Sequence, residues 1–140
     1  MAEYITNTGK HVSQYDVFVS GSQLKGGEQR KTMTGYQITH NGKEVCKRYS
    51  FMACTSLPKA MLQTVVEACN TLSDSSVIYI HTADSFTEGF INCGWSGPKT
   101  QEEANMIMEQ RKKHICILAI RDNSAILSKI TNNCRRMMYK

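Results

Sequence analysis

The pair Asn41–Gly42 constrains the fold of this chain more than any other feature. It separates two runs rich in Tyr, Ile, Thr, Val and Phe, which span residues 34–40 and 43–51. A two-residue turn between strands needs positive φ at both central residues, and Asn followed by Gly adopts such angles readily. The sequence therefore predicts a β-hairpin in which the two runs are antiparallel neighbours.

Three further runs are apolar throughout and short. They span residues 17–19, 77–80 and 115–120. A strand covered on both faces of a sheet is continuously apolar, and runs of this length are too short for helices. We therefore expect three buried strands, and the first should end at Ser20, where Ser20-Gly21-Ser22 interrupts the apolar run.

Four segments carry apolar residues at helical spacing, which predicts helices with one buried face. They span residues 57–72, 85–93, 100–113 and 124–140. In the second segment Ser85 and Glu88 have the spacing of a capping box, so Ser85 is the expected N-cap and Glu88 its partner.

The resulting order is β-β-β-α-β-α-α-β-α, which predicts an α/β protein with a mixed five-stranded sheet flanked by helices. The right-handed crossover rule places the fourth strand parallel to the first and beside it. We expect one domain over residues 15–140, preceded by an N-terminal arm over residues 1–14.

Composition sets limits on location and on cysteine chemistry. No stretch approaches the ~20 apolar residues of a membrane span, and the polar N-terminus has no signal-peptide core, so a cytoplasmic protein is expected. The six cysteines are spaced singly, without a C-x-x-C pair, which indicates reduced core thiols. The net charge of +5 suits a polyanionic partner without requiring one.

The predicted order resembles the ribonuclease H-like fold from Tyr15 onward. Local matches accompany it: the small-residue turn Ser20-Gly21-Ser22, the Asn-Gly hairpin and the start of the first helix, where Lys59-Ala60-Met61-Leu62 stands for the family's Arg-Ala-Glu-Leu. Thr82-Ala83-Asp84-Ser85 is similar to the family's Thr-Asp-Ser with one residue added. The resemblance implies a fold whose active members cleave the RNA of an RNA–DNA hybrid.

The resemblance also implies where the metal-binding carboxylates should lie. Active members hold two Mg²⁺ ions with four acidic side chains, and on this chain the first two positions fall on Ser20 and Met61. Near the last helix only Ser124, Ser128 and Thr131 are available. Only Asp84 keeps a carboxylate, which is too little to bind the ion. We therefore expect no metal cofactor in a catalytically inactive, binding protein, and the resemblance implies a virus or mobile element as its source.

Two other functions stay open at this stage. One is an active Mg²⁺- or Mn²⁺-dependent nuclease with a rearranged site around Asp84 and Glu88, to which Asp122 could contribute. Asp16 is excluded from such a site, because four strand residues place it about 13 Å from Ser20. The other is a protein-interaction or inhibitor module in which the positive charge is incidental.

Two histidines and a serine are candidates for acid–base groups. His81 and His114 flank the strands on the side of the cleft, where a histidine can shuttle protons. Ser20 with His81 could form a nucleophile and base, but no nucleophile elbow accompanies them. Packed or hydrogen-bonded side chains are the simpler interpretation of all three.

Eight basic residues form the predicted nucleic-acid-binding set, with an RNA–DNA hybrid or duplex as partner and a protein as the alternative. They are Lys43, Lys47, Arg48, Arg111, Lys112, Lys113, Arg135 and Arg136. Cations near the ends of the third and fourth helices also complement the helix dipoles. Tyr36, Tyr49 and Phe51 lie among the hairpin cations and could stack on bases. Trp95, the single tryptophan, could anchor a partner.

Overall fold

The computed structural model describes residues 4–5, 11–24, 31–53, 55–94 and 97–138 of the chain. Their strands are β1 (Tyr4–Ile5), β2 (His11–Val12), β3 (Gln14–Leu24), β4 (Lys31–His40), β5 (Lys43–Ala53), β6 (Val77–Thr82) and β7 (Cys116–Arg121). Their helices are α1 (Leu57–Asn70), α2 (Ser85–Cys93), a 3-10 turn η1 (Pro98–Thr100), α3 (Gln101–Lys113) and α4 (Ala125–Met138). Within these ranges no helix is long and apolar enough to cross a membrane.

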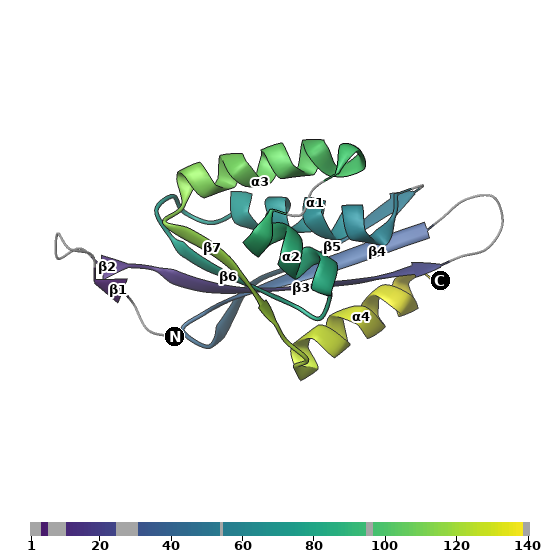
Figure 1. Cartoon of the computed structure of the whole chain (residues 1–140). Coiled ribbons are helices and arrows are strands. Elements are labelled where there is room, and N and C mark those ends of the chain that lie inside the picture. Colours follow the sequence, from purple (N-terminus) through teal and green to yellow (C-terminus); the bar gives the residue numbers. More distant parts are fainter. Residues whose placement is uncertain (1–3, 6–10, 25–30, 54, 95–96, 139–140) are drawn as a thin grey trace.

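The main sheet has the strand order β5-β4-β3-β6-β7, with β3 at its centre (Figure 1). β3 pairs antiparallel with β4, and β4 pairs antiparallel with β5. β3 pairs parallel with β6, and β6 pairs parallel with β7. The mixed five-stranded sheet and the parallel neighbour of the first long strand are therefore confirmed.

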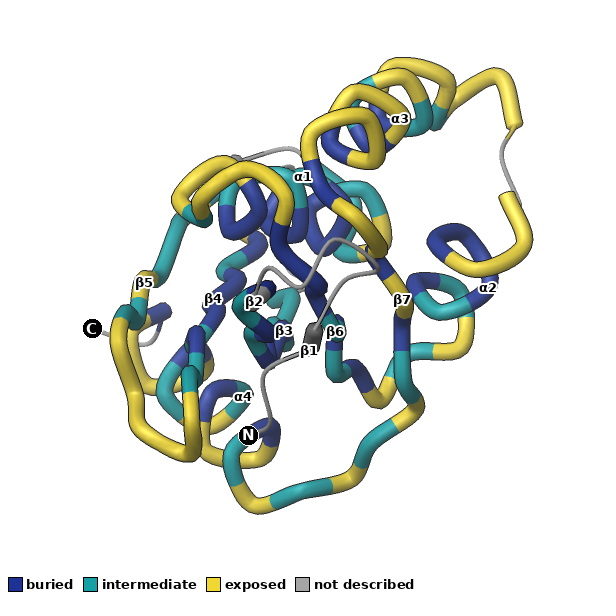
Figure 2. The backbone as a smooth tube through the Cα atoms, turned by 90° about the vertical axis from the view of Figure 1, so that its left-hand side faces the viewer, coloured by how far each residue is buried: buried dark blue, intermediate teal, exposed yellow. Residues whose placement is uncertain are grey.

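Helices cover both faces of this sheet, and Figure 1 shows α1, α2 and α3 on one side and α4 alone on the other. The larger core lies under the three helices, where Val17 and Val19 of β3 meet Leu62 and Val65 of α1. The smaller core joins Phe18 of β3 to apolar side chains of α4. Alternate residues of β3 thus enter two different cores, so the strand is buried on both faces as its apolar run predicts (Figure 2).

The hairpin turn has the geometry that its sequence predicts. Asn41 has φ 54° and Gly42 has φ 79°, so both central residues are left-handed. Near the N-terminus, β1 and β2 form a separate antiparallel pair. β3 begins at Gln14, one residue before the predicted start of the domain.

Two local expectations are wrong. Ser20 does not end the first strand, because β3 continues to Leu24 and pairs with β4 along that whole stretch. The cysteines are not all core thiols, since Cys93 and Cys116 are exposed whereas Cys69 and Cys134 are buried. Burial raises the pKa of the Cys69 thiol to about 12. The described cysteines are free thiols, as predicted, and Cys54 lies outside the described residues.

The outer edge of β7 is occupied by side chains. The Asn92 amide donates to the carbonyl of Ala119 and its oxygen accepts from the Ala119 N–H, both at 2.8 Å. The Arg111 guanidinium donates to the carbonyl of Ile117 at 3.1 Å. Asn92 therefore mimics the backbone of a neighbouring strand, and the edge offers fewer free groups to another chain.

Replacing Asn92 with Ala should lower the free energy of unfolding by about 1–2 kcal/mol, because it removes two hydrogen bonds from a half-buried edge. Urea unfolding measures this change. Asn132→Ala, an exposed asparagine on α4, is the matched control and should have little effect. Equal stability of the two variants would contradict the strand-mimic role.

Candidate functional site

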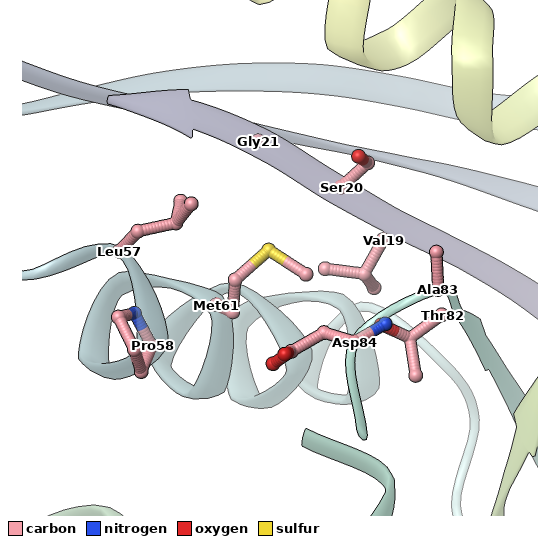
Figure 3. A pocket seen from close by; sticks show the side chains of 9 residues that line it. All are labelled: Val19, Ser20, Gly21, Leu57, Pro58, Met61, Thr82, Ala83 and Asp84. Atoms are coloured by element: carbon pink, nitrogen blue, oxygen red, sulfur yellow. The ribbon is translucent and has the colours of Figure 1, made fainter. Parts of the chain in front are cut away.

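A cavity of about 250 Å³ lies where β3, the end of β6 and the first turn of α1 converge (Figure 3). Its lining residues are Val19, Ser20, Gly21, Leu57, Pro58, Met61, Thr82, Ala83 and Asp84. The structure thus brings together Ser20, Met61 and Asp84, three residues that the sequence assigns to the family's metal-binding positions. Most of the other lining side chains are apolar.

The Ser20 side chain is hydrogen-bonded to a side chain of α4. Its Oγ lies 2.5 Å from Oγ1 of Thr131, while the Thr131 hydroxyl donates to the carbonyl of Leu127 at 3.0 Å. Ser20 must therefore be the donor to Thr131. Figure 3 shows the Ser20 hydroxyl on the side of β3 that faces away from Met61. The first predicted metal position and one of the three candidates near the last helix therefore carry neutral hydroxyls that are hydrogen-bonded to each other.

The other candidates near α4 supply no carboxylate either. Ser124 precedes the helix, and its buried Oγ has no hydrogen-bond partner among the described residues. Ser128 is exposed, and its N–H donates to the Ser124 carbonyl at 3.3 Å. Of the three hydroxyl residues named from the sequence, Thr131 is the one that contacts Ser20.

Met61 places a thioether at the second position. The side chain is almost fully buried in the core of α1 and β3 and points into the cavity in Figure 3. Mg²⁺ is a hard cation that binds oxygen, whereas thioethers bind soft metals. This position therefore contributes packing in place of a ligand.

Asp84 is the N-cap of α2. Its Oδ2 accepts from the Thr87 N–H at 3.0 Å and from the Thr87 hydroxyl at 2.6 Å. The expected capping box of Ser85 with Glu88 is therefore wrong, because Ser85 is the first residue inside the helix. Glu88 lies 3.8 Å from the Arg121 guanidinium instead.

These residues do not fit a divalent metal pair. One carboxylate, already engaged by Thr87, cannot offset the dehydration of Mg²⁺. In the part of the chain that the structure describes, no group of three His, Cys, Asp or Glu side chains is arranged so that it could hold a metal ion. The described residues that line the cavity include no tyrosine or histidine.

A carboxylate–histidine–carboxylate bridge lies on the α4 side of the sheet, and the sequence did not reveal it. Nε2 of His81 lies 2.7 Å from Oδ1 of Asp16, and Nδ1 lies 3.1 Å from Oδ2 of Asp122. The ring stacks on Phe18 with centroids 4.3 Å apart. Each ring nitrogen therefore has a carboxylate oxygen as its partner, and the ring joins β3 to the end of β7 through the two carboxylates.

Neither histidine is placed as an acid–base group of the cavity. His81 has no free ring nitrogen to act as a base for Ser20. His114 lies two residues before β7, at the edge of the sheet where the parallel strands β6 and β7 begin. Asp84 lies two residues after β6, at the opposite edge. His114 is buried, and neither of its ring nitrogens has a partner among the described residues. The expectation that His114 flanks the cleft is therefore wrong.

The basic residues named from the sequence fall on separate parts of the molecule. On the hairpin, Lys43 is exposed, Lys47 lies 3.3 Å from Glu44, and Arg48 lies 3.8 Å from Glu67. These three residues lie on β5, the outer strand of the sheet.

At the end of α3 the cations have local partners. Arg111 donates to the carbonyls of Ile117 and Ile91, and Lys112 lies 3.1 Å from Glu109. Lys113 is exposed in the last turn of the helix. Arg111 therefore holds α3 against α2 and β7, and the predicted nucleic-acid contact of this group stays a prediction.

α4 has basic residues and no acidic residue along its length. Lys129, Arg135 and Arg136 are exposed on it. Figure 1 shows α4 on the opposite face of the sheet from α3. The eight predicted residues therefore do not form one surface, and α4 presents positive charge without a compensating carboxylate of its own. Trp95 lies outside the described residues.

Comparison with known proteins identifies the fold. No family profile and no curated protein matches the sequence. RNase H1 from the halophilic archaeon Halobacterium salinarum is similar in structure, with TM-score 0.72 and 11% identity over 89% of this chain and 98% of that chain. An RNase H1 in complex with an RNA/DNA hybrid gives TM-score 0.68 and 14% identity over 90% and 99%.

A third similar structure is the N-terminal RNase H domain of a Mycobacterium tuberculosis protein. It gives TM-score 0.69 and 7% identity over 89% of this chain and 96% of that chain. Identities this low carry information about the fold alone. The chain has the ribonuclease H-like fold over nine-tenths of its length, as the sequence predicts.

Replacing His81 with Ala should lower the free energy of unfolding by about 2–4 kcal/mol, because it leaves two partly buried carboxylates facing each other without the ring between them. Urea unfolding at pH 7 measures the loss. Adding Asp16→Asn to the His81→Ala variant removes one orphan charge and should recover part of the stability. A double variant less stable than His81→Ala would contradict the charged bridge.

Proposed function

We propose that this protein is a catalytically silent member of the ribonuclease H-like fold that binds nucleic acid. The observation that carries the proposal is the 2.5 Å contact between the hydroxyls of Ser20 and Thr131. In members that cleave nucleic acid, the resemblance implies a carboxylate at the position of Ser20 and another at the start of the last helix. Here the two side chains bind each other.

The physical argument is one of charge. A pair of divalent cations roughly 3.5–4 Å apart is stable only among several carboxylates, which offset both dehydration and mutual repulsion. Ser20, Met61 and Thr131 supply none, and the carboxylate of Asp84 caps α2. Water activation and leaving-group stabilisation by metal ions therefore have no support in this cavity.

Two observations favour nucleic acid as the partner. One of the similar structures is in complex with an RNA/DNA hybrid. The chain has net charge +5, and α4 combines three exposed cations with no acid. Phosphate backbones attract such surfaces through release of their counterions, so affinity should fall steeply as salt rises. A protein partner remains the competing outcome of the experiment.

The test uses a fluorescently labelled RNA–DNA hybrid, with single-stranded and duplex DNA of the same sequence beside it. We expect binding to at least one of these nucleic acids, equal in EDTA and in Mg²⁺, and no cleavage of the hybrid with Mg²⁺ or Mn²⁺. Asp84→Asn should change neither result. Metal-dependent cleavage that Asp84→Asn abolishes would establish the rearranged nuclease, and absence of binding to all of them would favour the protein-interaction module.

A restoration variant tests the charge argument directly. Ser20→Asp with Thr131→Asp places two carboxylates in contact, which should lower the Tm in EDTA, and Mg²⁺ should recover much of that loss because it neutralises them. The wild-type Tm should not respond to Mg²⁺. A wild-type protein that Mg²⁺ stabilises as strongly as the double variant would contradict the loss of the metal site.

A further inference from the structure

The outer strand β5 and α4 together form a second surface, away from the cavity. Side chains of a strand alternate between the faces of the sheet, so Lys47, Tyr49 and Phe51 share one face. Tyr49 shows which face this is, because its hydroxyl accepts a hydrogen bond from Asn133 of α4 at 2.9 Å. The three side chains therefore lie beside α4.

α4 turns a matching stripe of residues toward β5. Residues three and four apart share one side of a helix, so Asn133 is joined there by Lys129, Arg136 and Met137. The Arg136 guanidinium donates to the side-chain oxygen of Asn133. Tyr49, Phe51, Lys129, Asn133, Arg136 and Met137 are called the β5–α4 platform below.

The apolar members of this platform are open to solvent. Phe51 is 53% exposed and Met137 is 42% exposed. Phe51 pairs across the sheet with Met33, which packs under α4 with Tyr49. β3 and β5 run in the same direction, since each is antiparallel to β4, and Figure 1 shows α4 ending toward the end of β3. The exposed Phe51 ring thus lies opposite a half-buried neighbour on the same face of the sheet.

The charge around the ring has one sign. Lys129 and Arg136 are exposed and α4 contains no acid. Lys47, four positions along the strand from Phe51, lies 3.3 Å from Glu44, which is nearer to the hairpin turn. The two cations that α4 contributes to the platform have no acidic partner on their own helix.

We propose that the β5–α4 platform binds single-stranded nucleic acid, with a base stacked on Phe51 and its phosphates held by Arg136 and Lys129. The proposal rests on the proposed nucleic-acid function and names its surface and substrate class. Unpaired bases can stack on an exposed ring, whereas the bases of a duplex are covered by their neighbours. Exposed cations of α4 on the same face of the sheet as the ring match a sugar-phosphate chain that follows the stacked base.

The test measures binding of a labelled oligo(dT) of about 20 nucleotides. Phe51→Ala should weaken binding roughly 5- to 150-fold, the usual contribution of stacking on one base. Arg136→Gln should reduce the slope of log K against log salt by about 0.7, the value for one phosphate on a single strand. Phe51→Tyr keeps the ring and should retain the affinity.

Matched controls lie elsewhere on the molecule. Val45→Ala removes an equally exposed apolar side chain from the same strand, and Lys112→Gln removes a cation from α3. Val45→Ala should bind as the wild type does, and a smaller loss for Lys112→Gln than for Arg136→Gln would place the main phosphate contact on α4. Circular dichroism checks that each variant is folded.

Four results would overturn the proposal. If Phe51→Ala and Val45→Ala weaken binding equally, or oligo(dT) does not bind while the hybrid does, the platform is wrong and the proposed function stands. If oligo(dT), the hybrid and duplex DNA all fail to bind, both proposals fail. If the wild type self-associates on a sizing column and Phe51→Ala does not, the exposed ring belongs to a protein interface.

Discussion

The burial of β3 on both faces is the constraint on which the rest of this structure depends. The strand is paired with β4 on one side and β6 on the other, and its alternate residues enter the cores beneath α1 and α4. Any polar residue on β3 must therefore find a partner within the fold. Ser20 finds Thr131, and Asp16 finds His81.

Much of the fold could be predicted because its signals are local. The Asn41–Gly42 turn needs positive φ at two adjacent residues, and apolar runs report burial directly. The N-cap of α2 was misplaced by one residue, since Asp84 and Ser85 both satisfy the preferences for that position and the backbone alone decides between them.

The site was predictable in part. The absence of carboxylates at Ser20 and Met61 could be read from the sequence once the resemblance aligned them. The contacts that replace the carboxylates could not, since Ser20 and Thr131 are 111 residues apart and His81 meets partners 65 and 41 residues away. Asp16 is too far from Ser20 along β3 to share a metal site with it, yet it contacts His81 on the neighbouring strand β6. Sequence spacing measures distance within an element and says nothing of distance between elements.

The hydroxyl pair also explains how α4 can hold its place without a metal ion. Carboxylates at Ser20 and Thr131 would repel each other across the gap between β3 and α4, and cations would be needed to hold the two elements together. A neutral hydrogen bond removes this requirement and attaches the helix to the central strand directly. Since the same helix carries the exposed cations of the β5–α4 platform, the position of the platform depends on packing and hydrogen bonding. The proposed loss of the metal site is therefore compatible with the proposed binding surface, because hydroxyls at Ser20 and Thr131 keep α4 in place without cations.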